Sequence, residues 1–557
     1  MTKRIIVDPI TRIEGHLRIE VEIDSDNIIK DAWSSITLWR GIETILKGRD
    51  PRDAGLIVQR FCGVCTYSHY EASIMACEDA FGIKPPPNAR IVRNLINAAQ
   101  YLYDHIMHFY HLHCLDWVDI VSALSADPAK AVALARNYSE NPYNCSETHY
   151  KAVQARLKKF VESGRLGPFA NAYWGNPSYK LPPEANLVIT SHYLDALQVS
   201  KTGAQMMAIF GGKNPHPQSL VVGGVTCVMD ILETQRVGQY LYRLKEMKNF
   251  VETAYLPDVL LAASYYKDEG LKGIGCGGKN YLAYGGLPLD DDWKNTLLPR
   301  GVIRNGDLAR PLALDENKIT EEATHSWYKD PEALHPYEGK TDPDYTGFDE
   351  NGNVRGNEKY TWGKAPRYDG EPYEVGPLAR FIIGYAQGHK EIKALVDSTL
   401  KATGLPVTVL FSTLGRTAAR ALETKLVADN AEKWVHELIQ NIKAGDTRTW
   451  TRCDVPDKGQ GRGMTEVPRG ALGHWIRIEN KVIANYQAIV PSTWNSSPRD
   501  SDGKRGPYEE ALIGTRLANA DQPLEIIRTI HSFDPCMACA VHILTPGSDR
   551  IRAFKVT

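Results

Sequence analysis

Five long segments of the chain repeat apolar residues at intervals of three and four positions, which is the pattern of an amphipathic helix. The first runs from Asn88 to Trp117 without a proline, and the others span residues 185–210, 231–255, 377–402 and 412–444. Helices of this length gain most of their stability by packing on one another. We therefore expect a central bundle of long helices.

Shorter segments show the alternation that is typical of strands. Residues 4–8 and 17–24 predict two strands near the N-terminus, and the second alternates apolar and charged side chains as a half-solvated strand does. Residues 474–490 predict a hairpin that turns at Glu479 and Asn480. Together with the helices, these strands predict an α+β fold that is predominantly helical, with small peripheral β-sheets around the bundle and more than one domain.

Changes of composition along the chain predict how it is divided. Residues 1–60 form an N-terminal α+β segment, and residues 61–312 form the first part of the bundle. Residues 313–376 are rich in Pro, Gly, Asp, Tyr and Trp without periodicity. Because disordered linkers are poor in aromatic residues, we expect an ordered, irregular excursion that packs on the bundle. Residues 377–542 hold the second part of the bundle and the hairpin, and residues 543–557 follow as a C-terminal extension.

Length, charge and hydropathy narrow the class of protein. The chain has 557 residues and 65 basic against 67 acidic side chains, so neither nucleic acid nor an anionic membrane is expected as its main partner. No stretch approaches the roughly 18 uninterrupted apolar residues of a membrane span, which predicts a soluble chain. The start, MTKRIIVDPI, has neither an apolar signal-peptide core nor twin arginines. We expect either a cytoplasmic protein or export together with a partner.

Four of the ten cysteines form two Cys-x-x-Cys pairs, Cys62 with Cys65 and Cys536 with Cys539, near opposite ends of the chain. Such pairs occur in redox dithiols, in zinc sites and in other soft-metal sites. The first pair precedes a helical pattern over residues 67–81, and a helix N-terminus favours the thiolate. Neither pair has a thioredoxin-like context, and zinc ribbons place their pairs much closer together. The spacing favours a four-thiolate metal site, with separate redox dithiols or coincidence as alternatives.

The segments around both pairs resemble the large, catalytic subunit of nickel-iron hydrogenases. The first motif is RFCGVC with a following histidine, and the second is DPCMACAVH. The segments VDPITRIEGH, RGIE, GGKNPHP, EVPRGALGHW and VPSTWN are also similar to family motifs, so the resemblance covers essentially the whole chain. Residue 536 is an ordinary cysteine, so the selenium-containing branch of the family is not matched.

The resemblance implies a nickel-iron centre that is held by the four paired cysteines. Cys62 and Cys536 would be terminal nickel ligands, and Cys65 and Cys539 would bridge nickel to an iron that carries carbon monoxide and two cyanides. Four thiolates provide an electron-rich nickel that can change oxidation state, and strong-field diatomic ligands keep iron low-spin.

Buried cyanide nitrogens need hydrogen-bond donors, because an unpaired polar group in an apolar pocket is costly. By resemblance, Arg469 and Ser492 would supply side-chain donors, and Pro468 would help to shape the pocket. Asp104 and Asp534 would orient the Arg469 guanidinium, as carboxylates commonly do around a metal site.

Splitting of H2 also needs a base. The resemblance leaves two candidates, the Cys536 thiolate and the Arg469 guanidine, and it favours Cys536 because guanidinium rarely loses its proton in proteins. Glu14 resembles the glutamate that passes the proton onward, whereas without the motif it would be an ordinary carboxylate at the end of a strand. His69 resembles the histidine that hydrogen-bonds a bridging sulfur.

Three polar residues of the first long helix, Asp104, His108 and His111, fall on one helix face, a pattern that on its own suggests a metal site. The resemblance places only Asp104 near the active site. It also places His216, in GGKNPHP, near the interface with an electron-carrying partner.

A second ion and a processing step are implied at the C-terminus. Glu43, His542 and the backbone carbonyl of Ala488 match positions that bind a separate magnesium or iron ion. An endopeptidase would remove residues 543–557 after His542 once nickel is in place. Residues 551–556 of this extension have a strand-like pattern.

The resemblance implies that the protein reversibly oxidises H2 to two protons and two electrons. The other six cysteines are scattered, so electrons would leave through a small subunit that carries iron-sulfur clusters, in a heterodimer or a dimer of heterodimers. A twin-arginine signal on that subunit would place the pair on the periplasmic side of the membrane, beside a cytochrome b or another quinone-linked partner.

Two other functions remain as alternatives. A non-catalytic scaffold related to the quinone-site subunit of respiratory complex I would lack the paired cysteines. A zinc-stabilised structural protein would contain zinc in their place.

Overall fold

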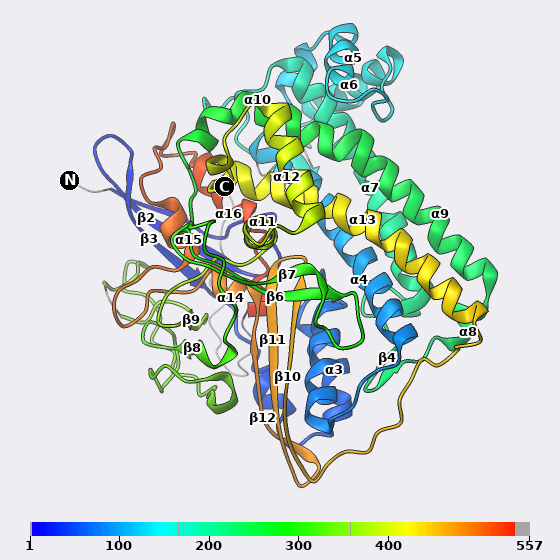
Figure 1. Ribbon diagram of the computed structural model, residues 1–557. Helices are drawn as coiled ribbons and strands as arrows, with labels where there is room; N and C mark the ends of the chain where they lie inside the picture. The colour runs from blue at the N-terminus through cyan, green and yellow to red at the C-terminus, as the bar shows by residue number, and fades with distance from the viewer. Residues whose placement is uncertain (1–2, 165–166, 171, 357, 541–557) are drawn as a thin grey trace.

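The computed structural model describes residues 3–164, 167–170, 172–356 and 358–540, and for Pro168, Cys539 and Ala540 only the backbone. It confirms the predicted α+β, predominantly helical fold. Figure 1 shows long helices on one side of the molecule and small antiparallel sheets on the other. No helix in the described ranges is both long and apolar enough to cross a membrane.

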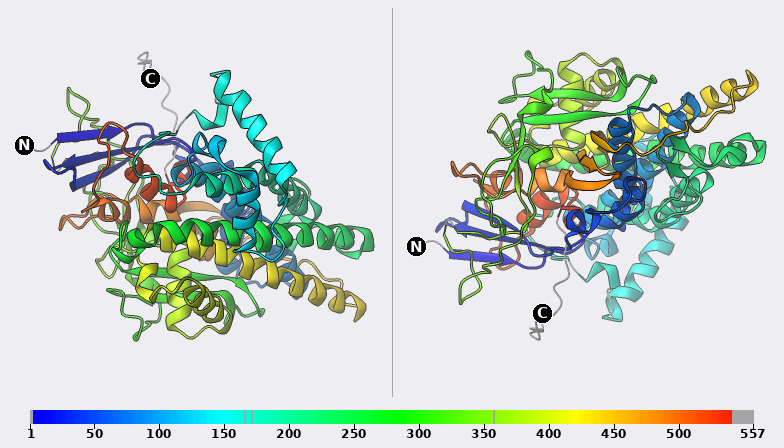
Figure 2. Two further views of the ribbon diagram at one scale, coloured as in Figure 1. Left: turned by 90° about the horizontal axis from the view of Figure 1, so that it is seen from above. Right: turned by 90° about the horizontal axis from the view of Figure 1, so that it is seen from below.

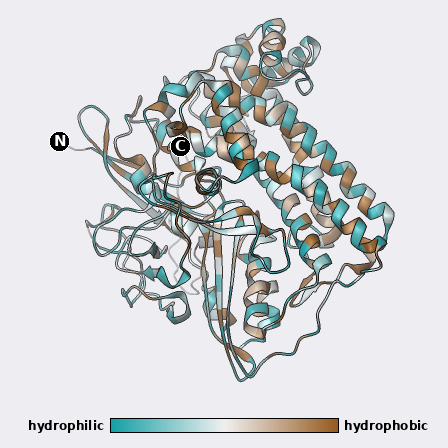
Figure 3. Ribbon diagram, viewed as in Figure 1, coloured by the Kyte–Doolittle hydropathy of each residue, from teal (hydrophilic) through white to brown (hydrophobic). Residues whose placement is uncertain are grey.

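The centre of the molecule is a bundle of four long helices, α4 (Pro87–Met107), α7 (Pro183–Gly211), α9 (Thr234–Phe250) and α13 (Thr413–Lys443). Helix α4 packs against α7 and α13, and α9 contacts the same two helices, as Figures 1 and 2 also show. Figure 3 shows apolar and polar residues alternating along these helices, as amphipathic packing requires. The four helices contribute many of the buried residues of the largest hydrophobic core.

Two of the predicted helices have different bounds. The α-helical part of the first ends at Met107 and continues as a π-helical segment, His108–His113. The segment 377–402 is two helices, α11 (Pro377–Ala386) and α12 (Lys390–Thr403). They separate at Gly388, whose φ of 73° interrupts the helix without steric cost.

The predicted helix over residues 231–255 also continues beyond its expected end. After α8 (Val228–Leu232) and α9, a π-helical segment, Val251–Tyr255, leads directly into α10 (Leu256–Leu271). Pro257 does not end the helix, because proline is tolerated in the first turn of a helical segment. The other helices are α1 (Ile42–Leu46), α2 (Ala54–Val58), α3 (Ser68–Phe81), α5 (Pro128–Arg136), α6 (Glu147–Glu162), α14 (Pro491–Asn495), α15 (Pro507–Leu512), α16 (Leu524–Ser532) and α17 (Met537–Ala540).

Two three-stranded antiparallel sheets carry most of the strand structure. One contains β1 (Lys3–Val7), β2 (Leu17–Ile23) and β3 (Ile29–Ile36), and the other contains β10 (Lys458–Val467), β11 (Gly470–Glu479) and β12 (Val482–Ile489). The two-stranded sheets are β4 (Leu220–Val221) with β5 (Gly224–Val225), β6 (Tyr281–Pro288) with β7 (Thr296–Ile303), and β8 (Ile319–Glu322) with β9 (Ala365–Tyr368).

The predicted hairpin is present, but its turn lies one residue further along. Asn480 and Lys481 form the turn with φ of 53° and 62°, and Glu479 still pairs with Val482. Two residues with positive φ are typical of the turn that suits the twist of a hairpin. The sequence analysis missed β10, which is rich in glycine. A Cβ at Gly463 would lie 1.9 Å from the carbonyl oxygen of Ala72, so α3 packs on β10 only because this residue has no side chain.

The interpretation of residues 17–24 as a half-solvated strand is wrong, and so is the expected packing of residues 313–376. Glu20 in β2 is fully buried, and it accepts a hydrogen bond from the backbone N–H of Val354. The excursion therefore covers the charged face of this sheet. Its aromatic residues Tyr368 and Tyr373 pack against β6, β7 and the β10–β12 sheet instead of the helical bundle.

Candidate metal centre

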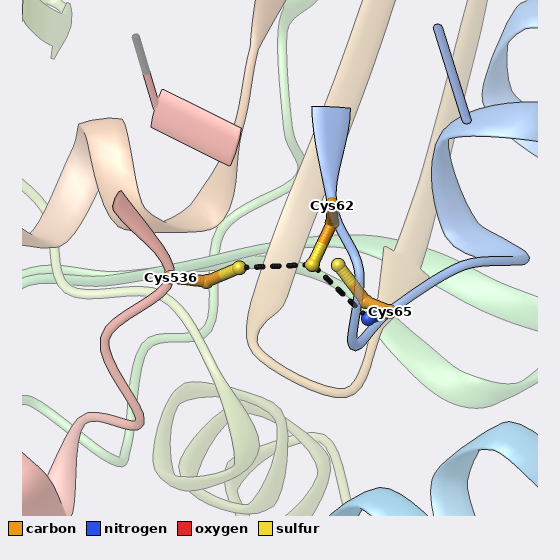
Figure 4. Close-up of side chains that lie close together, drawn as sticks. All are labelled: Cys62, Cys65 and Cys536. Carbon is orange, nitrogen blue, oxygen red and sulfur yellow. Dashed lines mark hydrogen bonds between the residues drawn. The ribbon is translucent and has the colours of Figure 1, made fainter. Parts of the chain in front are cut away.

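Cys62, Cys65 and Cys536 bring their thiol groups together in the interior, as Figure 4 shows. The sulfurs of Cys62 and Cys536 are 3.2 Å apart, and all three sulfurs lie within 4.8 Å of one another. No disulfide joins any two of these three residues. Three converging thiols form a site for a soft metal. The side chain of Cys539, the fourth predicted ligand, and all of His542 lie outside the described residues.

The loop of the first cysteine pair stabilises a negative charge on sulfur. The backbone N–H groups of Val64 and Cys65 donate hydrogen bonds to the Cys62 sulfur over 3.2 and 3.1 Å. Hydrogen bonds to the charged form favour a thiolate, which is the form that binds metals.

Backbone contacts join the two cysteine segments to the N-terminal part of the chain. The N–H of Met537 donates to the Glu14 carbonyl over 2.7 Å, and Arg40 donates to the carbonyls of Phe61 and Ala538. Gly15 has a φ of 82°, and a Cβ there would lie 2.5 Å from the Ala538 nitrogen. Only glycine therefore allows the RIEGH segment to approach the second pair so closely.

The carboxylate of Glu14 contacts the second cysteine pair directly. Its Oε2 atom lies 3.3 Å from the Cys536 sulfur and accepts a hydrogen bond from the Ala538 N–H over 3.0 Å. Burial and the neighbouring Cys62 thiolate raise the pKa of Glu14 to about 7. A carboxyl group with this pKa can both accept and release a proton near neutral pH.

Arg469 lies in the tight turn between β10 and β11, directly after the buried Pro468. Its Nη1 donates to Asp104 over 3.2 Å, and its Nη2 lies 2.9 Å from an oxygen of Asp534. Burial alone would lower the pKa of Arg469, but Asp534 and Asp104 raise it well above its ordinary value. The guanidinium is therefore fixed in place and remains protonated.

A cavity between the thiols and Arg469 has the chemistry that a nickel-iron group requires. Cys65, Cys536, Arg469 and Ser492 all line it. The Nε atom of Arg469 is buried and has no hydrogen-bond partner among the described residues. The Ser492 hydroxyl accepts from the Cys536 N–H over 3.0 Å, which leaves its own proton to donate. A metal group bound to the thiolates would present acceptor ligands to Arg469 and Ser492. The polar groups on both sides of the cavity would then have partners.

Comparison with known proteins agrees with this chemistry. A family model described as nickel-dependent hydrogenase matches residues 40–542, and a second, described as HoxL-like, matches residues 4–37. The chain is 53% identical to the quinone-reactive Ni/Fe-hydrogenase large chain of Wolinella succinogenes, with 100% of this chain and 98% of that protein covered. The chain belongs to the nickel-dependent hydrogenase family.

Two further relatives place the chain within the family. It is 50% identical to the uptake hydrogenase large subunit of Rhizobium leguminosarum bv. viciae, with 100% of this chain and 97% of that protein covered. The reduced, active Ni-Fe-Se hydrogenase of Desulfomicrobium baculatum has a TM-score of 0.79 and 36% identity, over 97% of this chain and all of the compared chain. The chain is a hydrogenase large subunit, the catalytic Ni-Fe subunit, and the alternative of a complex I scaffold finds no support.

Two residues that the sequence analysis missed position this hydrogenase site. Gln100 donates to Asp104 over 2.9 Å and to the Val64 carbonyl over 3.2 Å, so it links the Arg469 partner to the first cysteine loop. It lies one helical turn before Asp104, and this spacing could have indicated it. Arg380 donates to the carbonyls of Val467 and Pro468 over 3.0 and 3.1 Å. No motif or periodicity marks it.

The three polar residues predicted on one helix face do not act together. His108 Nε2 lies 2.7 Å from the His531 carbonyl, and His111 Nε2 lies 3.2 Å from the Tyr193 carbonyl. The π-helical segment begins at His108 and changes the angular spacing after Asp104. Asp104 alone of the three reaches the site. His216, only partly buried, lies with its Nε2 2.9 Å from the Cys62 carbonyl oxygen.

A second polar pocket surrounds Glu43. One carboxylate oxygen of Glu43 accepts from the Ala488 N–H over 2.9 Å, and the other accepts from the Thr341 hydroxyl. Glu321 and Lys364 line the same pocket. Thr341, Glu321 and Lys364 all belong to the irregular excursion, where the sequence analysis had no motif to identify them.

Another buried cluster combines His113, Asp116 and His531. Asp116 accepts from Arg12 and lies 3.0 and 2.7 Å from ring nitrogens of the two histidines. The Trp117 indole N–H donates to the other nitrogen of His113 over 2.8 Å. Every ligand atom of this cluster has a partner, so it is a structural hydrogen-bond network.

Proposed function

We propose that this subunit reversibly and heterolytically oxidises H2 at a nickel-iron centre held by Cys62, Cys65, Cys536 and Cys539. The observation that carries the proposal is a cavity lined by Cys65, Cys536 and Arg469, where the Nε of Arg469 has no hydrogen-bond partner among the described residues. When it is bound there, the metal group supplies the Lewis-acid and redox chemistry that polarises H2 and takes up its two electrons.

The donors on the far wall of the cavity suit the iron ligands that we propose. Arg469 and Ser492 both have a proton to donate, and Pro468 holds the turn on which Arg469 stands. Cyanide nitrogens accept hydrogen bonds, and carbon monoxide fits the apolar remainder, lined by Val467 and Leu472. This chemistry supports an iron with two cyanides and one carbon monoxide.

Cys536 is the first proton acceptor in this proposal, and Glu14 is the second. The two carboxylates beside Arg469 favour its protonated form, which argues against Arg469 as the base. The Cys536 sulfur has Glu14 within 3.3 Å, a distance over which a proton can pass directly. Arg469 then serves to orient and to donate, without losing its own proton.

The partners follow from what the chain lacks and from the names of its relatives. The other cysteines are scattered, so electrons pass to a small subunit with iron-sulfur clusters, docked near His216, in a heterodimer or a dimer of heterodimers. The name of the quinone-reactive relative supports a cytochrome b or another quinone-linked membrane partner. We place the assembly on the periplasmic side of the membrane, exported with the small subunit.

A second ion and a maturation step complete the proposal. Glu43, the Ala488 carbonyl and His542 would bind Mg²⁺ or Fe²⁺, with water in the remaining places. An endopeptidase would remove residues 543–557 and free His542 for this role. The intact mass of the active subunit is then expected to end at His542, and an active subunit of full length would contradict this step.

Metal analysis combined with infrared spectroscopy of the purified heterodimer tests the proposal. We expect one nickel per large subunit and infrared bands from metal-bound carbon monoxide and cyanide. Zinc in place of nickel, with no such bands, would refute it.

A further inference from the structure

Three buried side chains form a hydrogen-bonded line that ends at the wall of the thiol cavity. His69 Nδ1 lies 3.0 Å from His474 Nε2, and His474 Nδ1 lies 2.6 Å from the Tyr486 hydroxyl. The three residues come from α3, β11 and β12, and none is more than 1% exposed. His69 lines the cavity together with Cys65 and Cys536.

Burial lowers the pKa of His474 well below its ordinary value, so this ring is neutral. Its Nε2 lies 3.0 Å from His69 Nδ1, so one of these two nitrogens donates and the other accepts. A neutral imidazole has one N–H and one acceptor nitrogen. The protons along the line must therefore all point in the same direction.

The cavity determines that direction. Because Nδ1 of His69 already makes a hydrogen bond with His474, only Nε2 of His69 can contact a group in the cavity. Thiolate sulfurs accept hydrogen bonds and repel a lone pair, so a proton on His69 Nε2 is the tautomer that suits the cavity. In that tautomer His69 Nδ1 accepts from the Nε2–H of His474, whose Nδ1 in turn accepts from the Tyr486 hydroxyl.

We propose that His474 and Tyr486 are positioning residues that fix the tautomer of His69 and keep its Nε2–H as a donor to the sulfur ligands of the metal centre. This inference rests on the proposed function, because the sulfurs are ligands only if the nickel-iron group is bound. A hydrogen bond to a ligating sulfur withdraws electron density that the sulfur would otherwise give to the metals.

The packing around the two imidazoles allows their hydrogen bonds to be tested separately from their shape. The ring of Phe61 lies 4.6 Å from that of His69 and 6.0 Å from that of His474, between ring centroids. The phenyl ring of Phe61 has no N–H or O–H group, so it packs on the two imidazoles without choosing a tautomer. Removal of the Tyr486 hydroxyl alone should therefore change the protons and leave the rings where they are.

Tyr486→Phe in the holoenzyme heterodimer tests the line, with Tyr240→Phe as a matched control. Tyr240 is equally buried, and its hydroxyl donates to the Leu95 carbonyl over 2.7 Å, within the helical bundle. We expect both variants to retain nickel. Only Tyr486→Phe should shift the carbon monoxide band to lower wavenumber, because a sulfur with a weaker hydrogen bond donates more electron density. Equal band positions in the two variants would overturn the proposal.

Two substitutions of His474 provide a rescue test. The amide nitrogen of glutamine can replace the Nε2–H donor, so His474→Gln should keep the band close to its wild-type position. His474→Met fills similar space without a donor, and it should shift the band as Tyr486→Phe does. Equal shifts in the two variants would mean that His474 only fills space, which would overturn the proposal.

A readout without the metals separates this inference from the proposed function. If the wild-type protein itself shows no nickel and no diatomic bands, the proposed function fails. The line is then judged by ¹⁵N NMR of histidine-labelled protein. Protons on Nε2 of both His69 and His474 would support the line, and a proton on Nδ1 of His474 would overturn it.

Discussion

Among the described residues, two buried clusters each bring three possible metal ligands within 4.8 Å of one another, but only one of the two has the features of a metal centre. In the cluster of His113, Asp116 and His531, Arg12 and Trp117 occupy the positions that an ion would need. In the cluster of the three cysteines, a cavity remains beside the sulfurs, and the Nε of Arg469 has no partner among the described residues.

The difference shows that ligand type and spacing do not by themselves identify a metal site. Buried polar atoms in proteins are nearly always hydrogen-bonded, so an orphaned donor beside a cavity indicates a missing group. A fully satisfied network indicates the opposite, because a metal could enter only by breaking existing bonds. The predictions below test this distinction.

Replacement of a cysteine in the thiol cluster should have the largest effect. Cys62→Ser removes a thiolate ligand, and we expect complete loss of nickel and of H2 oxidation. Cys77→Ser is the control, because Cys77 is also buried but only donates to the Pro51 carbonyl over 3.3 Å. Nickel analysis of both variants checks the prediction, and nickel retained in Cys62→Ser would contradict it.

Asp116→Asn should affect stability instead of metal content. It leaves Arg12 buried without its carboxylate, which costs about 3–5 kcal/mol, while nickel stays at the wild-type level. Thermal unfolding checks this, with the exposed Asp521→Asn as the unaffected control. If Asp116→Asn lost nickel and kept wild-type stability, the cluster of His113, Asp116 and His531 would be a metal site, and the prediction would be contradicted.

The same substitution has a predictable pH dependence. Burial opposes ionisation of Asp116, but Arg12 and His531 hold its pKa well below the ordinary range. A depressed carboxyl pKa stabilises the folded state above the unfolded pKa, and this contribution is lost as the pH falls through the folded pKa. The difference in unfolding temperature between wild type and Asp116→Asn should stay constant around neutral pH and shrink only in strong acid. A difference that changed across neutral pH would contradict this.

Glu14→Gln should slow turnover while leaving the metals bound. General acid-base groups contribute about a hundredfold or more to rates, and glutamine cannot carry the proton away from Cys536. Activity per nickel is the measurement, with the exposed Glu338→Gln as a control. Unchanged turnover in Glu14→Gln would remove this residue from the proton path.

Arg380→Lys should have the smallest of these effects on activity. Lysine cannot reach Glu423, Glu466 and the Val467 and Pro468 carbonyls together, so the turn that carries Arg469 should loosen. Loss of such supporting contacts lowers activity about 10-fold or somewhat more. Arg367→Lys is the matched control, because it changes an equally buried arginine that pairs with Asp500. Equal activity in the two variants would contradict the positioning role.

The fold and the site could be predicted where local sequence decides the structure. The long helices follow from periodicity, and α13 begins and ends almost where the pattern does. Gly388 divides a predicted helix because its positive φ interrupts the helix. The pattern of apolar residues gives no information about φ. Burial of Glu20 depends on the excursion that covers it, and no feature of the strand itself reveals such a cover.

The same distinction between local sequence and tertiary packing applies to the residues of the site. Residues in short motifs, such as Cys62 and Arg469, could be identified from the sequence. Arg380 and Glu321 act through contacts with residues far away in the chain, and tertiary packing alone brings these together. Sequence patterns identify the residues of the metal centre better than the residues that hold them in place.

Anomalous X-ray diffraction at the nickel absorption edge tests the central claim most directly, since it locates the metal in crystals of the holoenzyme. The account predicts one nickel peak among the sulfurs of Cys62, Cys65 and Cys536, and none at His113, Asp116 and His531. A nickel peak at the histidine cluster, or no nickel at the thiols, would contradict it.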